Sequence, residues 1–162
     1  MYTNDGNYVN IRDPELCEFI EIIEDRFAKM HSFMQLTDDT YQELDKCWIN
    51  IKPASSITSP HIHPRKFLTA VYYVSVSTGS GDLFLMNPNP HHDHIIPADA
   101  TQNVVKSYNE FNSSQHIIKP ETGKLVIFPS WIMHYVQPGD GSERISIALD
   151  SSIVNKDKRI KY

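Results

Sequence analysis

The chain has 162 residues, and its 20 acidic against 15 basic side chains give a formal net charge of −5. This length allows one domain with a core of ordinary size, and 40% apolar with 22% charged residues is a normal globular balance. The acidic balance disfavours a general nucleic-acid-binding protein, and no apolar run approaches the roughly 18 residues of a membrane span.

The N-terminal segment and the two cysteines bear on the cellular compartment. Residues 1–10 are polar and lack the basic start and apolar stretch of a signal peptide. Cys17 and Cys47 form no CxxC pair, so reduced thiols and a cytoplasmic location are expected. The sequence leaves the oligomeric state open, with a homodimer as one option.

A helix is predicted near the N-terminus. Asp13 can cap free backbone N–H groups, and Pro14 suits the first helical position. Apolar residues then recur at spacings of three and four over about 17 residues. These residues are Leu16, Phe19, Ile20, Ile23, Phe27 and Met30. A shorter second helix is expected after Thr37, because Asp38 and Asp39 suit a positive helix end.

From residue 47 onward the sequence predicts strands. Residues 67–76 give the strongest signal, because they are rich in aromatic and β-branched side chains. Further strands are expected at 47–52, 82–86, 116–119, 124–128, 134–137 and 144–150. A helix or two followed by roughly seven or eight short strands favours a mainly β fold, a sandwich or barrel with flanking helices. We divide one domain, 1–162, into a helical support (13–46), a β core (47–150) and a C-terminal tail (151–162).

Residues 87–114 form a long polar segment that contains Pro88, Pro90 and Pro97. Long loops in compact domains are usually functional or mobile, so this one could cover a site and contact substrate. Within it, His91-His92-Asp93-His94 contains an HxD pattern that could bind a metal. A solvated loop tip is the other interpretation, and we favour it because no apolar strand follows the cluster.

Eight histidines are present, and His61-Ile62-His63 stands directly before the strongest strand. In an extended chain, residues two apart point to the same side, so both imidazoles could face one metal ion. Two solvent-facing loop histidines beside Pro60 and Pro64 would give the same pattern. His134, at the start of a later strand, is by itself compatible with a structural histidine.

Arg144 and Ser146 share one face of an otherwise apolar strand. An arginine that projects into a barrel interior would be a costly buried charge and would need an anion. A carboxylate held by two parallel N–H bonds would supply that anion. The alternative is an edge-strand arginine that faces water and pairs with Glu143 or another acidic neighbour.

Taken together, the order of these motifs resembles the iron(II)- and 2-oxoglutarate-dependent oxygenases. The resemblance covers about residues 47–150 and is closest to the prolyl-4-hydroxylase-like branch and to small members from phage and marine bacteria. The motifs that carry it are His61-Ile62-His63-Pro64, residues 68–74 (LTAVYYV), Gly81-Asp82-Leu83, residues 123–129 (GKLVIFP), residues 134–138 (HYVQP) and Glu143-Arg144-Ile145-Ser146. The resemblance implies a double-stranded β-helix, a jelly-roll barrel of two four-stranded sheets.

The resemblance also implies roles for individual residues. His61 and His134 match iron ligands, and Arg144 matches the residue that binds the distal carboxylate of 2-oxoglutarate. The remaining expected cosubstrate contacts are Ser146, Tyr73, Thr69 and Asn50. The implied cofactors are Fe(II), 2-oxoglutarate as cosubstrate and O2, with ascorbate as a reductant.

One position departs from the family pattern. Most members carry Asp or Glu two residues after the first histidine, whereas this chain carries His63. Three interpretations are open. His63 is a third iron ligand, or the iron is held by two histidines together with water or a distant carboxylate, or the chain has lost activity. We favour the first, because imidazole suits iron and the spacing keeps both histidines on one side.

The resemblance implies hydroxylation of a small-molecule or peptidyl substrate, with prolyl residues as one option, and release of succinate and CO2. No membrane or nucleic-acid partner is expected. The alternative is a cupin-like metal-binding protein, which would be either a 2-oxoglutarate-independent dioxygenase or an inactive binding module. The two readings differ at Arg144, because only the first needs it for 2-oxoglutarate.

Overall fold

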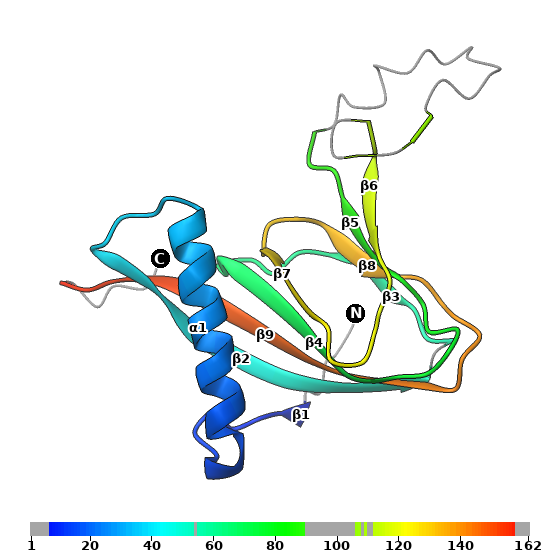
Figure 1. The fold of residues 1–162 in the computed structure, drawn as a ribbon, viewed down its shortest axis with the longest axis horizontal. Coiled ribbons are helices and arrows are strands. Elements are labelled where there is room, and N and C mark those ends of the chain that lie inside the picture. The colour runs from blue at the N-terminus through cyan, green and yellow to red at the C-terminus, as the bar shows by residue number, and fades with distance from the viewer. Residues whose placement is uncertain (1–6, 54, 90–105, 108, 110–111, 158–162) are drawn as a thin grey trace.

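The computed structural model describes residues 7–53, 55–89, 106–107, 109 and 112–157. Nine strands and two helical segments are found in these ranges (Figure 1). They are β1 (Asn7–Tyr8), η1 (Pro14–Leu16), α1 (Cys17–Phe33), β2 (Thr40–Pro53), β3 (Thr58–His61), β4 (Leu68–Val76), β5 (Leu83–Met86), β6 (Gln115–Ile118), β7 (Leu125–Pro129), β8 (His134–Val136) and β9 (Glu143–Asn155). No helix in the described ranges is long and apolar enough to cross a membrane.

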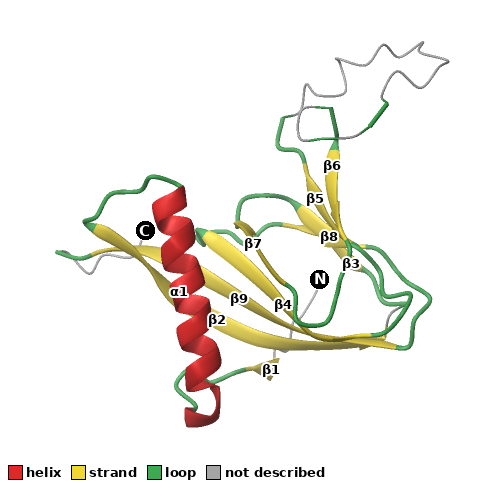
Figure 2. Cartoon of the chain, viewed as in Figure 1, coloured by secondary structure: helices red, strands yellow, loops and turns green. Residues whose placement is uncertain are grey.

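The strands form two antiparallel sheets (Figure 2). The larger sheet has the order β1-β2-β9-β4-β7, and the smaller has the order β3-β8-β5-β6. This arrangement confirms the expected mainly β architecture of two facing sheets. The larger sheet has five strands where four were expected, because the short β1 pairs with Trp48 and Ile49 of β2.

The N-terminal helix forms as predicted. The Asp13 side chain accepts a hydrogen bond from the backbone N–H of Glu15 at 3.0 Å, and Pro14 occupies the first helical turn. Helix α1 lies across one face of the larger sheet (Figure 1), where Ile23 and Phe27 are almost fully buried. Burial of each such side chain contributes roughly 1.5–3 kcal/mol. Their core partners are Ile20, Leu44, Cys47, Leu68, Ala70 and Leu149.

The predicted second helix after Thr37 is wrong. Thr37–Thr40 forms a turn, closed by the Thr40 N–H donating to the Thr37 carbonyl at 3.1 Å, and β2 begins at Thr40. β2 then pairs with β9 along its whole length, from Thr40 opposite Asn155 to Pro53 opposite Glu143. This long-range pairing outweighs the local preference of Asp38 and Asp39 for a helix start.

Two boundaries of the predicted division therefore change. Residues 40–46, expected in the helical support, belong to β2, and residues 151–155, expected in the tail, belong to β9. β3 was not predicted as a strand, because Pro60 is a poor strand residue. The structure accommodates it because β3 is an edge strand of the smaller sheet.

Alternation along β9 gives the larger sheet two different faces. Leu149 packs in the core with α1, whereas its neighbours Ala148 and Asp150 line a cavity on the opposite face. Strand β4 behaves in the same way, with Ala70 in the core and Thr69 at the cavity. Because successive side chains point to opposite faces, one face of the sheet supports the helix and the other is free to form a site.

Candidate iron and 2-oxoglutarate site

The cavity beside the larger sheet has a volume of about 480 Å³. Residues from β2, β4 and β9 line one side of it, and residues from β3 and β8 of the smaller sheet line the other. All eight site residues named from the sequence lie on its wall: His61, His63, His134, Arg144, Ser146, Tyr73, Thr69 and Asn50. The sequence motifs are therefore brought together by the fold.

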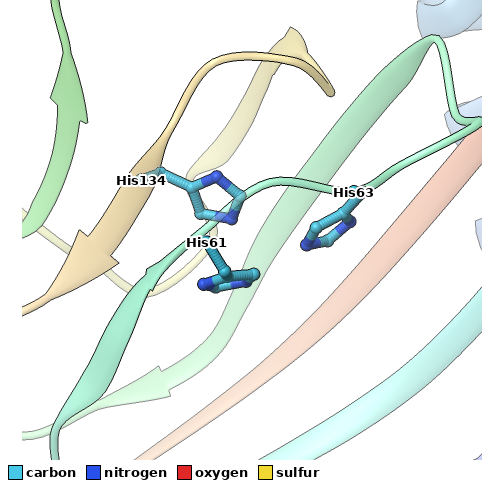
Figure 3. Close-up of side chains that lie close together, drawn as sticks. All are labelled: His61, His63 and His134. Atoms are coloured by element: carbon cyan, nitrogen blue, oxygen red, sulfur yellow. The ribbon is translucent and has the colours of Figure 1, made fainter.

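Three of the histidines that line this cavity lie close together (Figure 3). The ligand atoms that His61, His63 and His134 can offer all lie within 4.8 Å of one another. His61 ends β3 and His134 begins β8, and these two residues are directly opposite in the ladder. The strand pairing therefore brings together ligands that are more than 70 residues apart in the sequence.

Each of the three imidazoles has an acceptor for its Nδ1 atom. His61 Nδ1 lies 2.8 Å from the Ser59 carbonyl oxygen, and His134 Nδ1 lies 3.0 Å from that of Ile132. His63 Nδ1 lies 2.6 Å from Asp150 Oδ1. When Nδ1–H donates in this way, the lone pair is on Nε2, which is the arrangement found for metal-binding histidines.

Burial favours the neutral imidazoles that a metal requires. Desolvation lowers the pKa of His134 to about 4, and desolvation also lowers the pKa of His61. Neutral nitrogen donors of this kind suit Fe(II). The donor set therefore fits an iron ion held by three Nε2 atoms.

A second group of polar residues lies further along the same face of the sheet. Ser146 of β9 is directly opposite Asn50 of β2 on one side and Tyr73 of β4 on the other. Tyr73 and Ser146 are buried, at 2% and 5% exposure. Desolvation raises the pKa of Tyr73 to about 12, so its phenol stays protonated and can donate a hydrogen bond.

Arg144 is buried at the cavity wall, with 7% of its surface exposed. Its Nη1 donates to the Gly81 carbonyl at 3.0 Å, and desolvation lowers the pKa of the guanidinium. No ion pair between Arg144 and a carboxylate is found among the described residues. The alternative of a solvent-facing arginine paired with Glu143 is wrong, because β9 is the central strand of its sheet. A buried cation of this kind calls for an anionic ligand.

Thr69 lies at the histidine end of the cavity, and its hydroxyl is engaged by protein atoms. Thr69 Oγ1 donates to Asp150 Oδ1 at 2.8 Å and lies 2.9 Å from Ser130 Oγ. The expected contact of Thr69 with 2-oxoglutarate stays a prediction. The rival cluster His91-His92-Asp93-His94 lies outside the described residues.

The sequence analysis missed Asp150 as a site residue. Asp150 is 4% exposed and contacts His63. The signal was present, because Asp150 stands at an even spacing from Arg144 and Ser146 and so shares their strand face. Trp48 was also missed, and its ring lies 5.7 Å from that of His63 between centroids.

Two facing antiparallel sheets with three clustered histidines define a β-sheet architecture that could hold a metal ion. The comparisons with known proteins give the family. A protein-family model described as "Putative 2OG-Fe(II) oxygenase" matches residues 46–150, and the chain therefore belongs to this family. No curated protein sequence matches the chain.

Solved structures of 2-oxoglutarate oxygenases share the fold. A 2OG-Fe(II) oxygenase family oxidoreductase from Burkholderia pseudomallei has a TM-score of 0.61 at 14% identity, covering 90% of this chain and 65% of its own. A prolyl-4-hydroxylase from Pseudomonas putida has a TM-score of 0.56 at 18% identity, covering 91% and 71%. A viral collagen prolyl hydroxylase from Paramecium bursaria Chlorella virus-1, in complex with 2-oxoglutarate, has a TM-score of 0.57 at 13% identity, covering 89% and 76%. This likeness identifies the fold as the double-stranded β-helix.

Proposed function

We propose that this chain is a non-haem Fe(II)- and 2-oxoglutarate-dependent dioxygenase that hydroxylates a peptidyl or small-molecule substrate. His61, His63 and His134 would hold the iron, through the Nε2 atoms that their Nδ1 hydrogen bonds leave available. When bound, iron and 2-oxoglutarate supply the oxidation, in which succinate and CO2 are released and one oxygen atom enters a substrate C–H bond. The chain spans 65% of the Burkholderia protein, so its activity as a whole protein is part of this proposal.

The observation that carries the proposal is the pairing of a three-histidine cluster with a buried arginine in one cavity. Arg144 and Tyr73 would donate hydrogen bonds to the distal carboxylate of 2-oxoglutarate, and Ser146 and Asn50 lie beside them across three adjacent strands. Two parallel N–H bonds from a guanidinium fix both the position and the orientation of a carboxylate. Arg144 thus orients the cosubstrate and takes no part in the bond changes.

A peptidyl target, with prolyl residues first among those to test, fits the cavity opening. Ile57 and Ile62 line the cavity and are 58% and 42% exposed, so the opening offers apolar contact surface. Two solved structures of similar fold are prolyl hydroxylases. The two cysteines are free, which agrees with the proposed cytoplasmic location.

The proposal is tested by anaerobic calorimetric titration with Fe(II) and then with 2-oxoglutarate, followed by assay of succinate after O2 is admitted with ascorbate as reductant. We expect His61→Ala and His134→Ala to lose iron binding, with the exposed His116→Ala as the matched control. Failure of the wild-type chain to bind Fe(II) would refute the proposal.

The same titration distinguishes the proposed oxygenase from the cupin-like alternative. The observation that speaks for that alternative is the donor set of three histidines. A protein of that kind would bind Fe(II) but would not bind 2-oxoglutarate through Arg144. Substrates can then be screened with proline-containing peptides, by following the gain of one oxygen atom in mass spectra together with succinate release.

A further inference from the structure

Asp150 is a buried carboxylate that accepts a hydrogen bond from a candidate iron ligand. It is 4% exposed, and its Oδ1 lies 2.6 Å from His63 Nδ1. The same oxygen accepts a hydrogen bond from Thr69 Oγ1 at 2.8 Å. Taking a carboxylate out of water is costly, so its position on the cavity wall needs a compensating partner.

The Asp150 side chain is part of a closed ring of hydrogen bonds around His63. Thr69 Oγ1 connects Asp150 to Ser130 Oγ, and the Ser130 carbonyl accepts the backbone N–H of His63 at 3.0 Å. Thr69 and Ser130 are almost fully buried. Three residues, Asp150, Thr69 and Ser130, therefore fix both the main chain and the ring of His63.

His63 differs from the other two histidines in the charge of its acceptor. His61 and His134 donate to neutral backbone carbonyls, whereas His63 donates to a carboxylate. A carboxylate on the outer nitrogen fixes the tautomer, orients the ring and makes the inner nitrogen more basic. It also places one negative charge beside His63 Nδ1, across the imidazole ring from the Nε2 atom that would bind the metal.

We propose that Asp150 is a positioning residue that supplies, through His63, the negative charge that a ligand carboxylate supplies at the usual HxD site. This inference rests on the proposed function, since it takes His63 as an iron ligand. The pair of His63 and Asp150 then carries the same formal charge as a directly bound aspartate. The histidine at the position where the family usually has a carboxylate, His63, and the buried Asp150 of β9 therefore act together.

The first test measures the affinity of the metal-free protein for Fe(II) alone, anaerobically, without 2-oxoglutarate or turnover. Asp150→Asn keeps the shape and removes the charge, and we expect it to weaken Fe(II) binding by about 10–100-fold. The exposed Asp38→Asn is the matched control and is expected to stay within twofold. Unchanged affinity in Asp150→Asn would overturn the inference, whereas a wild-type chain that takes up no Fe(II) would overturn the proposed function itself.

The second test asks whether Asp150 acts through His63. In a His63→Ala background, Asp150→Asn should cost less than twofold in Fe(II) affinity, because the group it supports is gone. A further 10-fold loss in that background would show that Asp150 acts on the fold in general, and would overturn the inference.

The third test uses the size of the effect. His63→Asp places a carboxylate at the usual ligand position, so the charge is supplied there directly and no imidazole remains for Asp150 to orient. In this background Asp150→Asn should cost clearly less Fe(II) affinity than in the natural chain. A merely structural Asp150 would give equal losses in both backgrounds. If Asp150→Asn with His63 does not fold, which the thermal midpoint of each metal-free variant will show, the second test still decides the question, because both of its chains lack His63.

Discussion

Arg144 and Asp150 lie six residues apart on the same face of β9 and line the same cavity. At about 3.4 Å per residue they are roughly 20 Å apart along the strand. Asp150 contacts the candidate iron ligand His63. The Arg144 guanidinium lines the other part of the cavity, where it donates to the Gly81 carbonyl and has no carboxylate partner among the described residues. One strand thus sets the separation between the histidine cluster and the arginine expected to bind the cosubstrate.

Removing the arginine should separate metal binding from cosubstrate binding. We expect Arg144→Ala to weaken 2-oxoglutarate binding by about 100-fold, because two charge-assisted hydrogen bonds of about 1.5 kcal/mol each are lost. Fe(II) affinity should change less than twofold. Calorimetric titration measures both, and Arg26→Ala on the exposed face of α1 is the control. Wild-type affinity for 2-oxoglutarate in Arg144→Ala would contradict the role given to this residue.

Adjacent tyrosines on β4 provide a matched pair. Tyr73 faces the cavity, whereas Tyr72 faces the helix side, where its ring lies 5.3 Å from that of Phe19. Tyr73→Phe removes one hydrogen-bond donor and should weaken 2-oxoglutarate binding by about 10-fold, which corresponds to roughly 1.4 kcal/mol. Tyr72→Phe should leave that affinity unchanged. Equal effects of the two substitutions would show that the phenol of Tyr73 does not contact the cosubstrate.

The backbone at Gly81 positions the acceptor for Arg144. A Cβ atom at Gly81 would lie 1.7 Å from the Gln137 carbonyl oxygen, so the two turns must separate if it is added. Gly81→Ala should destabilise the protein by about 3 kcal/mol, and it should also weaken 2-oxoglutarate binding through the displaced carbonyl.

Gly123→Ala is the comparison for that effect. No atom lies within 4 Å of its added Cβ, but its φ of +84° costs about 1–2 kcal/mol with a side chain. Thermal unfolding and calorimetry together check both variants. If Gly123→Ala weakened 2-oxoglutarate binding as much as Gly81→Ala, the effect would come from general destabilisation.

Because His134 is buried, we expect the stability of the metal-free protein to depend on pH. His134 has a pKa of about 4 when folded against 6.5 for an ordinary histidine, because burial disfavours its charged form. Between these pH values the unfolded chain binds the extra proton, so stability falls as pH falls from about 6.5 to 4, by about 3 kcal/mol.

Denaturant titrations at pH 7 and pH 5 measure this dependence. His134→Asn should flatten it, whereas the exposed His116→Asn should leave it unchanged. A metal-free protein that is equally stable at both pH values would contradict the burial effect.

The sequence predicted most of the fold because the strongest signals are local and periodic. Helix α1 follows from the cap at Asp13 and an apolar stripe, and β4 follows from a run of β-branched and aromatic residues. β2 could not be recognised in full, because its first residues gain strand structure only by pairing with the end of β9. Such long-range pairing leaves no local signal.

In the candidate site, too, local motifs were recognised from the sequence and a long-range contact was missed. The motifs identified the three histidines and Arg144, and the fold brings all four to one cavity. Asp150 was missed because its partner His63 is 87 positions away in the chain. The even spacing from Arg144 and Ser146 indicates the strand face of Asp150, but it does not indicate which histidine Asp150 contacts.

The alternation along β9 also limits how this chemistry could be re-engineered. Leu149 packs against the helix while Ala148 and Asp150 face the cavity, so a register shift of one residue would exchange core-packing side chains for cavity-lining ones. Transplanting the centre into another scaffold would therefore require the whole strand in its original phase. Grafting the three histidines alone would leave behind both the carboxylate and the guanidinium.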